Sequence, residues 1–80
     1  MWHNTIVRLE DLTIIIERGE DNLWIATIPE IPGAVSQGAT VDEARENVLD
    51  ALIELMAARR ELAMAERRPD ATVERLRLTS

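Results

Sequence analysis

The stretch that decides the fold reads Trp24-Ile-Ala-Thr-Ile-Pro29-Glu30-Ile-Pro32-Gly33-Ala-Val-Ser-Gln-Gly38-Ala-Thr40-Val-Asp-Glu43-Ala44. Its two prolines fix φ and remove two amide donors, so the loop between them can neither continue a sheet nor begin a helix. Gly33 and Gly38 provide the backbone freedom to leave one turn and enter the next. Thr40 and Glu43 have the spacing of a capping box, which satisfies unpaired amides at a helix start. The order therefore predicts a strand, a rigid turn, a short strand and a helix.

The residues before this stretch predict a β-hairpin. Residues 12–17, Leu-Thr-Ile-Ile-Ile-Glu, form a strand too apolar for one face to lie in water. Residues 18–22 have the composition of a turn, and residues 23–28 return as the second strand. A third short strand is predicted over residues 34–37. Residues 5–9 form either a separate edge strand or the first half of one bent strand.

Alternation along the second strand gives each face of the sheet large apolar groups. Trp24, Ala26 and Ile28 share one face, and Leu23, Ile25 and Thr27 share the other. A single helix covers only one of these faces. We therefore expect Leu23 and Ile25 to contribute to self-association.

A long helix is predicted from Val41 to a point between Arg59 and Arg68, where Pro69-Asp70 stops it. The residues expected to face the sheet follow i, i+3, i+4, i+7 spacing: Val41, Ala44, Val48, Ala51 or Leu52, Leu55 and Leu62. A second stripe, offset around the axis, makes the apolar arc wider than a surface helix requires and adds to the expected self-association residues: Leu49, Ile53 and Met56.

Residues 72–78 alternate leucine with arginine and predict a closing, half-exposed strand. The predicted fold is a two-layer α+β sandwich of order β-β-β-α-β, with one long helix packed on one face of a small antiparallel or mixed sheet. We expect residues 1–80 to form a single domain.

Composition favours an oligomer. Hydrophobic residues make up 46% of the 80-residue chain, yet it has no cysteine for a disulfide that would support a small core. We therefore expect a homodimer or homotetramer. The chain has neither an apolar run of about 20 residues nor a visible signal peptide, so we expect a cytoplasmic protein that does not enter membranes.

The net charge of −6 is unevenly distributed. Residues 1–58 carry three arginines and eleven acids, whereas residues 59–80 carry six arginines and four acids. The acidic body opposes binding to a phosphate backbone and favours a basic partner, although a plain solvated surface has the same composition. The arginines near the helix end form either a helix C-terminus or a nucleic-acid patch: Arg59, Arg60, Arg67 and Arg68.

The sequence contains no convincing catalytic, cofactor or metal site. His3 is the single histidine, and without cysteine it makes no zinc site. The acids Glu43, Glu46, Asp50 and Glu54 follow helical spacing, which is typical of a solvated face. We therefore expect a protein that is not an enzyme. Trp24 is either a core residue or an anchor for a partner.

The central stretch resembles the signature of the HicB family, the antitoxin half of a bacterial type II toxin–antitoxin pair. The resemblance spans about residues 12–56 and is carried by Trp24, Pro29-Glu30-Ile31-Pro32-Gly33, Ser36-Gln37-Gly38, Thr40, Glu43-Ala44, Asn47 and Ala51. It implies a fold similar to a partial double-stranded-RNA-binding domain or a truncated ribonuclease-H-like sheet. One position departs from the pattern: Ala34 stands where many relatives carry cysteine. Many relatives also append a DNA-binding module, which we do not expect here because few residues follow the predicted helix.

The resemblance implies a non-catalytic binding module that neutralises a small basic ribonuclease of the HicA type by covering its catalytic surface. The candidate contacts are Trp24, Glu30, Asp42, Glu43 and Glu46. Two alternatives remain: an orphan homo-oligomeric domain without a toxin, and a minimal nucleic-acid binder that uses the C-terminal arginines. For the isolated chain we do not expect nucleic-acid binding.

Overall fold

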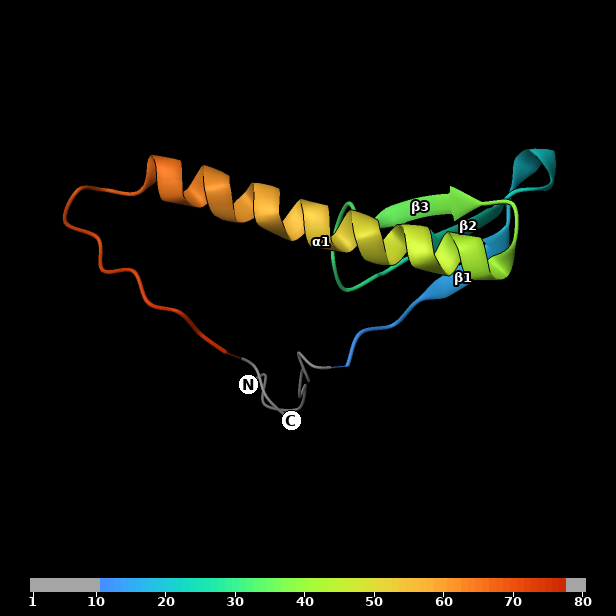
Figure 1. Cartoon of the computed structure of the whole chain (residues 1–80), viewed down its shortest axis with the longest axis horizontal. Helices are drawn as coiled ribbons and strands as arrows, with labels where there is room; N and C mark the ends of the chain where they lie inside the picture. The colour runs from blue at the N-terminus through green and yellow to red at the C-terminus, as the bar shows by residue number, and fades with distance from the viewer. Residues whose placement is uncertain (1–10, 78–80) are drawn as a thin grey trace, which may run out of the picture.

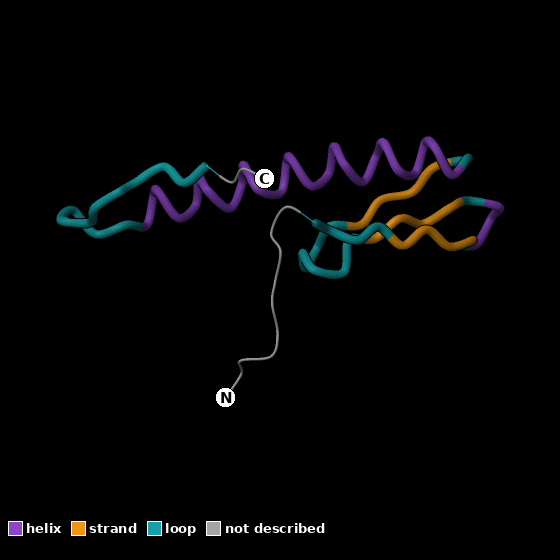
Figure 2. The backbone as a smooth tube through the Cα atoms, turned by 90° about the horizontal axis from the view of Figure 1, so that it is seen from below, coloured by secondary structure: helices purple, strands orange, loops and turns teal. Residues whose placement is uncertain are grey.

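The computed structural model describes residues 11–77, which form an antiparallel sheet followed by one long helix. The elements are β1 (Ile15–Arg18), a short 3-10 helix η1 (Glu20–Asn22), β2 (Trp24–Thr27), β3 (Val35–Gly38) and α1 (Val41–Glu66). The strands lie in the order β1-β2-β3. Figure 1 shows α1 crossing the sheet, and Figure 2 shows that it lies on one side of it. The α+β class and the packing of the helix on a three-stranded sheet are confirmed.

The strand register decides which face of the sheet the helix covers. Ala26 lies opposite Ile16 on β1 and Ser36 on β3, and it is fully buried. The core that α1 closes over this face is small and built mainly of short side chains: Ala26, Ile28, Ala34, Ala44 and Val48. The other face carries Ile15, Thr27 and Val35 in one row, and no described helix or strand packs on it.

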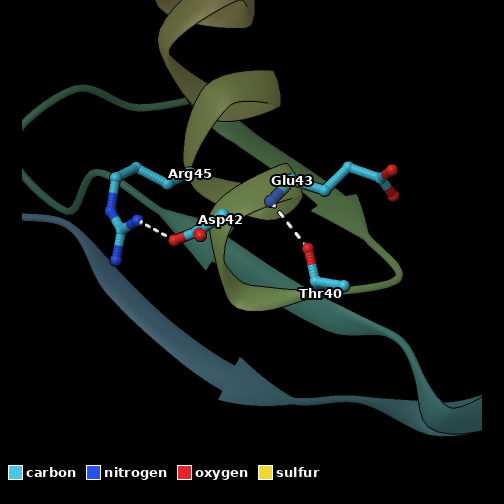
Figure 3. A network of polar contacts seen from close by, with 4 residues as sticks. All are labelled: Thr40, Asp42, Glu43 and Arg45. Atoms are coloured by element: carbon cyan, nitrogen blue, oxygen red, sulfur yellow. Dashed lines mark hydrogen bonds and ion pairs between the residues drawn. The ribbon is translucent and has the colours of Figure 1, made fainter.

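The helix start follows the predicted capping pattern (Figure 3). Thr40 is the N-cap, and its hydroxyl oxygen accepts a hydrogen bond from the Glu43 amide at 3.0 Å. The Glu43 carboxylate accepts from the amide of Ala39, one residue before the cap, at 2.6 Å. Two amides that lack helical partners are thereby satisfied. The helix ends at Glu66, inside the predicted window.

The two glycines of the central stretch serve different needs. Gly33 has a φ of +92°, so it occupies the conformation that side chains with a Cβ disfavour. Gly38 is needed for space, because a Cβ there would lie 2.6 Å from the Ala44 amide nitrogen. The end of β3 therefore lies directly against the first turn of α1.

Two predictions for the C-terminal third are wrong. The predicted closing strand over residues 72–78 does not form in its described part, residues 72–77, and Leu78 lies outside the described residues. Leu62 lies on the predicted side of α1 but beyond the end of the sheet, so it is not covered and is 59% exposed. Both errors have one cause: the 26-residue helix is about 39 Å long, whereas a four-residue strand spans about 13 Å. The second half of α1 therefore projects beyond the sheet, and the segment after it leaves from the far end (Figure 1).

The strand boundaries also differ by a few residues from those predicted. β1 begins at Ile15 instead of Leu12, and β3 is displaced by one residue toward the helix. The turn predicted over residues 18–22 contains η1, with positive φ at Asp21 and Asn22. Residues 5–9 lie outside the described part of the chain.

Candidate partner-binding surface

The first half of α1 presents an acidic surface to solvent. Its exposed carboxylates project from successive turns: Asp42, Glu43, Glu46, Asp50 and Glu54. Arg45 is the one basic residue among residues 41–58, and it pairs with Asp42 at 2.6 Å (Figure 3). Such an exposed ion pair contributes little to stability. Among these five carboxylates, Asp42 is the one with an ion pair within residues 11–77.

The predicted contact residues differ in how they are engaged. Glu43 is bound to the backbone at the helix start, and Asp42 is bound to Arg45. Glu46 forms no hydrogen bond or ion pair with any residue in the described range. All three therefore lie on one helix, and of the three only Glu46 has a carboxylate that is unpaired within residues 11–77.

Glu30 lies in the proline turn and serves a local structural role. Its two carboxylate oxygens accept hydrogen bonds from the Thr13 amide at 3.0 Å and the Thr13 hydroxyl at 2.6 Å. These bonds favour the charged form, and they hold the pKa of Glu30 below its ordinary value of 4.5. The carboxylate thus joins the turn to the segment before β1, a contact between residues 17 positions apart that sequence spacing did not reveal.

Trp24 lies at the margin of the core. It is half-buried, packs against the core cluster, and faces Arg18 across the β1–β2 register. The Arg18 guanidinium carbon lies 4.6 Å from the indole centroid, a cation–π geometry. An arginine therefore lies over the ring of the residue proposed as a partner anchor.

The arginines of the predicted nucleic-acid patch do not form one cluster. Arg59 donates to the carbonyl oxygen of Pro32 at 2.7 Å, and Arg67 donates to the carbonyl oxygen of Met64 at 2.5 Å. Arg68 lies 3.7 Å from Asp70. Arg60 forms no hydrogen bond or ion pair within residues 11–77. The contact from Arg59 fixes the proline turn to the helix, a role that sequence reasoning missed because 27 residues separate the two groups.

Asn47 makes a second tie between helix and sheet. Its side-chain amide donates to the carbonyl oxygen of Gln37 at 2.8 Å. The contact satisfies a carbonyl of β3, which is an edge strand. The Asn47 side chain thus helps to hold α1 against β3.

The residues predicted for self-association lie on opposite sides of the molecule. Leu23 and Ile25 belong to the sheet side that α1 does not cover, where both are half-buried. Leu49, Ile53 and Met56 lie on α1, where they are 41%, 66% and 50% exposed. The structure therefore does not bring the two sets together into one surface.

Residues 11–77 offer neither a cluster of metal ligands nor a helix suited to a membrane. No group of three His, Cys, Asp or Glu side chains within residues 11–77 is arranged to hold a metal ion. In the same range no helix combines the length and the apolar character needed to cross a membrane.

Comparison with known proteins adds evidence of relationship. The family model for the HicB-like antitoxin of bacterial toxin–antitoxin systems matches residues 12–77. Two UPF0150 proteins of Synechocystis are 36% and 48% identical to the chain over 43 and 42 residues, covering 54% and 52% of it. A UPF0150 protein of Thermoplasma acidophilum is 38% identical over 40 residues, or 50% of the chain.

These matches cover 62%, 58% and 58% of the respective relatives, so the chain spans about three fifths of their length. No solved structure gives a significant match. The family model nevertheless extends from before β1 to beyond the end of α1 and includes the capping box and the proline turn. The chain therefore belongs to the HicB-like antitoxin family.

Proposed function

We propose that this protein is a non-catalytic antitoxin that neutralises a small basic ribonuclease by covering its catalytic surface. Membership of the antitoxin family supports the class of function. The acidic surface on the first half of α1 is the observation that supports the chemistry of the partner. A ribonuclease binds a polyanion and therefore needs basic groups around its site, which are complementary to such a surface.

The carboxylates of α1 should affect the rate at which the two proteins associate as well as the stability of their complex. Charges on one face raise the association rate with an oppositely charged partner, and this effect falls as salt increases. Glu46 is the residue best placed for direct contact, because it is exposed and unpaired within residues 11–77. Trp24, Glu30, Asp42 and Glu43 remain proposed contacts, with Glu30 and Glu43 already holding the loop and the helix start.

Neutralisation by covering requires a rigid surface. The capping box, the Asn47 contact with β3 and the Arg59 contact with the proline turn hold α1 on the sheet. The acidic residues between positions 42 and 54 are therefore presented from the fixed half of the helix. Such preorganisation reduces the entropy that binding must overcome.

The test is binding to the product of an adjacent gene that encodes a basic protein of about one small domain. The two proteins should co-purify, and the complex should lose the ribonuclease activity of the basic partner. Glu46→Gln should weaken the complex by about threefold to tenfold at low salt, because it removes one charge from the interface. Glu61→Gln, on the projecting half of α1, is the matched control and should leave binding unchanged.

Other outcomes separate the alternatives. Failure to bind any basic neighbour would favour an orphan domain that associates with itself. If Glu61→Gln weakens binding as much as Glu46→Gln, the charges of the docked half are not the contact surface.

A further inference from the structure

The two edges of the sheet differ in how their backbone groups are used. The strands lie in the order β1-β2-β3, so β1 and β3 are both edge strands. Figure 1 shows β1 at the lower margin of the sheet, with no described helix or strand beyond it. An edge strand with free N–H and C=O groups is a template on which another extended segment can pair. What each edge offers therefore depends on which of its outward groups already have partners.

The outward groups of β1 follow from its pairing with β2. The amide of Gly19, the residue after β1, donates to the carbonyl oxygen of Leu23 at 2.7 Å. Bonding directions alternate along an antiparallel strand, so Glu17 and Ile15 also bond to β2. The residues whose N–H and C=O groups point away from the sheet are Ile14, Ile16 and Arg18. These backbone groups have no hydrogen-bond partner within residues 11–77.

The edge of β3 is already partly closed. By the same alternation, the backbone groups of Val35 and Gln37 point away from β2. The Val35 amide donates to the carbonyl oxygen of Gly33 at 3.1 Å, and the carbonyl oxygen of Gln37 accepts from the Asn47 side chain at 2.8 Å. The end of β3 also lies against the first turn of α1. The edge of β1 is therefore the more open of the two.

The side chains around the β1 edge define the chemistry of a partner. Ile16 packs on the core from the side of the sheet that α1 covers, whereas Glu17 on the opposite side is exposed and unpaired within residues 11–77. Residues 11–30 carry five acids and one arginine, and this Arg18 is held over an indole ring. Side chains of an added strand alternate between the two sides. A matching segment therefore places apolar residues beside Ile16 and basic residues beside Glu17.

We propose that the outer edge of β1 binds an extended, basic segment of another protein as an added strand. Main-chain hydrogen bonds to Ile14, Ile16 and Arg18 hold this segment, and its alternate side chains provide specificity. The acidic surroundings favour a cationic partner through charge complementarity. The inference does not rest on the proposed antitoxin function, since it uses backbone groups of β1 and none of the carboxylates of α1.

Hydrogen exchange of the protein alone tests whether this edge is open. In NMR measurements, the amides of Ile16 and Arg18 should exchange at least about tenfold faster than those of Ile15 and Glu17, which bond to β2. The competing occupants of the edge are residues 72–77 of the same chain and a second copy of the chain. Equal protection of Ile16 and Glu17 would show that one of these already covers the edge, and it would overturn the proposal.

A synthetic peptide that alternates arginine and valine tests the pairing directly. At about 1 mM, a peptide of about eight residues should slow exchange of the Ile16 amide by about tenfold and shift its resonance. A peptide that alternates glutamate and valine is the matched control and should do neither, because its charge has the same sign as the edge region. Resonance shifts confined to α1 or β3 would place the peptide elsewhere and overturn the proposal.

Methylation of the peptide backbone separates strand pairing from attraction between side chains. In an added strand every second amide points to β1, and the others point to solvent. A peptide N-methylated at its valines and one N-methylated at its arginines should therefore differ, with one losing about tenfold in affinity and the other binding as before. Equal affinities of the two methylated peptides would show that no strand pairing occurs.

A charge substitution tests the location of the basic side chains. Glu17→Gln should weaken binding of the arginine–valine peptide by about twofold to threefold at low salt, because one exposed carboxylate beside the edge is removed. Glu61→Gln, on the projecting half of α1, is the matched control and should leave binding unchanged. The same loss in both variants would indicate general attraction between an acidic protein and a cationic peptide, and it would overturn the proposed site.

Discussion

The two halves of α1 have similar sequence patterns and different environments. In the first half, Ala44 and Val48 are fully buried against the sheet, and Asn47 is bound to β3. In the second half, Leu62 occupies the same face of the helix but is 59% exposed, because the sheet ends before it. Apolar periodicity therefore identifies a face of a helix, whereas the size of the neighbouring sheet decides how much of that face is covered.

The projecting half keeps its helical form without tertiary support from the sheet. Residues 57–66 read Ala-Ala-Arg-Arg-Glu-Leu-Ala-Met-Ala-Glu, all residues with high intrinsic helix propensity. Propagation from the docked half avoids the cost of a new helix nucleus. The docked half depends on packing, and the projecting half depends on local preference.

The largest effect should distinguish the two halves directly. Val48→Ala should lower the free energy of unfolding by about 2–3 kcal/mol, because it removes buried methyl groups and leaves a cavity. Leu62→Ala should change it by less than about 0.5 kcal/mol. Urea denaturation followed by circular dichroism measures both values. Equal losses would show that the second half is also packed in solution.

The junction between β3 and α1 is the next most sensitive point. Gly38→Ala should cost about 1–3 kcal/mol, since its Cβ would meet backbone atoms of Glu43 and Ala44 within 3 Å. Gly19→Ala is the comparison, because its Cβ would also lie 2.6 Å from its nearest atom, but that atom is Cγ1 of the Ile25 side chain and not backbone. Comparable thermal stability of Gly38→Ala and the parent would show that the helix start is not held against the strand.

The proline turn tests backbone conformation separately from packing. Gly33→Val should cost about 1–2 kcal/mol, because a β-branched residue disfavours a φ of +92°. The space around Gly33 is adequate, with the nearest atom 3.5 Å from the added Cβ, so the cost comes from the backbone. An unchanged melting temperature would contradict the turn conformation.

The Thr13–Glu30 contact gives the docked region a pH dependence. Since folding lowers the pKa of Glu30, its contribution to stability is present above the unfolded pKa and is lost as pH falls through the folded pKa. Thr13→Val should raise the pKa of Glu30 measured by NMR titration. The melting temperature of the Thr13→Val variant should approach that of the parent protein in acid, where the contact is lost in both. Glu30→Gln should remain folded, because an amide oxygen can still accept one bond. A Glu30 pKa unaffected by Thr13→Val would show that the contact does not form in solution.

The smallest effect is expected in assays of nucleic-acid binding and cleavage. Duplex DNA should bind weakly near physiological salt, because three of the four arginines near the helix end are engaged within the chain and the net charge is −6. RNA should not be cleaved, because the sequence offers no activated nucleophile. Gel shift and nuclease assays with and without divalent metal measure these properties. Tight binding that is lost in Arg60→Glu would instead assign a nucleic-acid surface to the projecting half.

Local patterns predicted the elements of the fold well. The proline turn, the Thr40 cap and the alternation of the second strand gave the element order and the sheet face that the helix covers. These signals depend on backbone geometry within a few residues, which sequence carries directly. The candidate contacts on α1 were named from the family resemblance and the acidic charge of this region, and helical spacing adds that they share one side of the helix.

Sequence alone determined the strand–turn–strand–helix order, the helix cap, the acidic face and the need for glycine at position 33. The tertiary structure alone decided where the sheet ends beneath α1, and therefore why Leu62 is exposed and why residues 67–77 form no fourth strand. It also decided the pairings of Arg59 with Pro32 and of Glu30 with Thr13. These contacts join residues far apart in the chain, and their geometry depends on how the helix docks on the sheet, which no local pattern encodes.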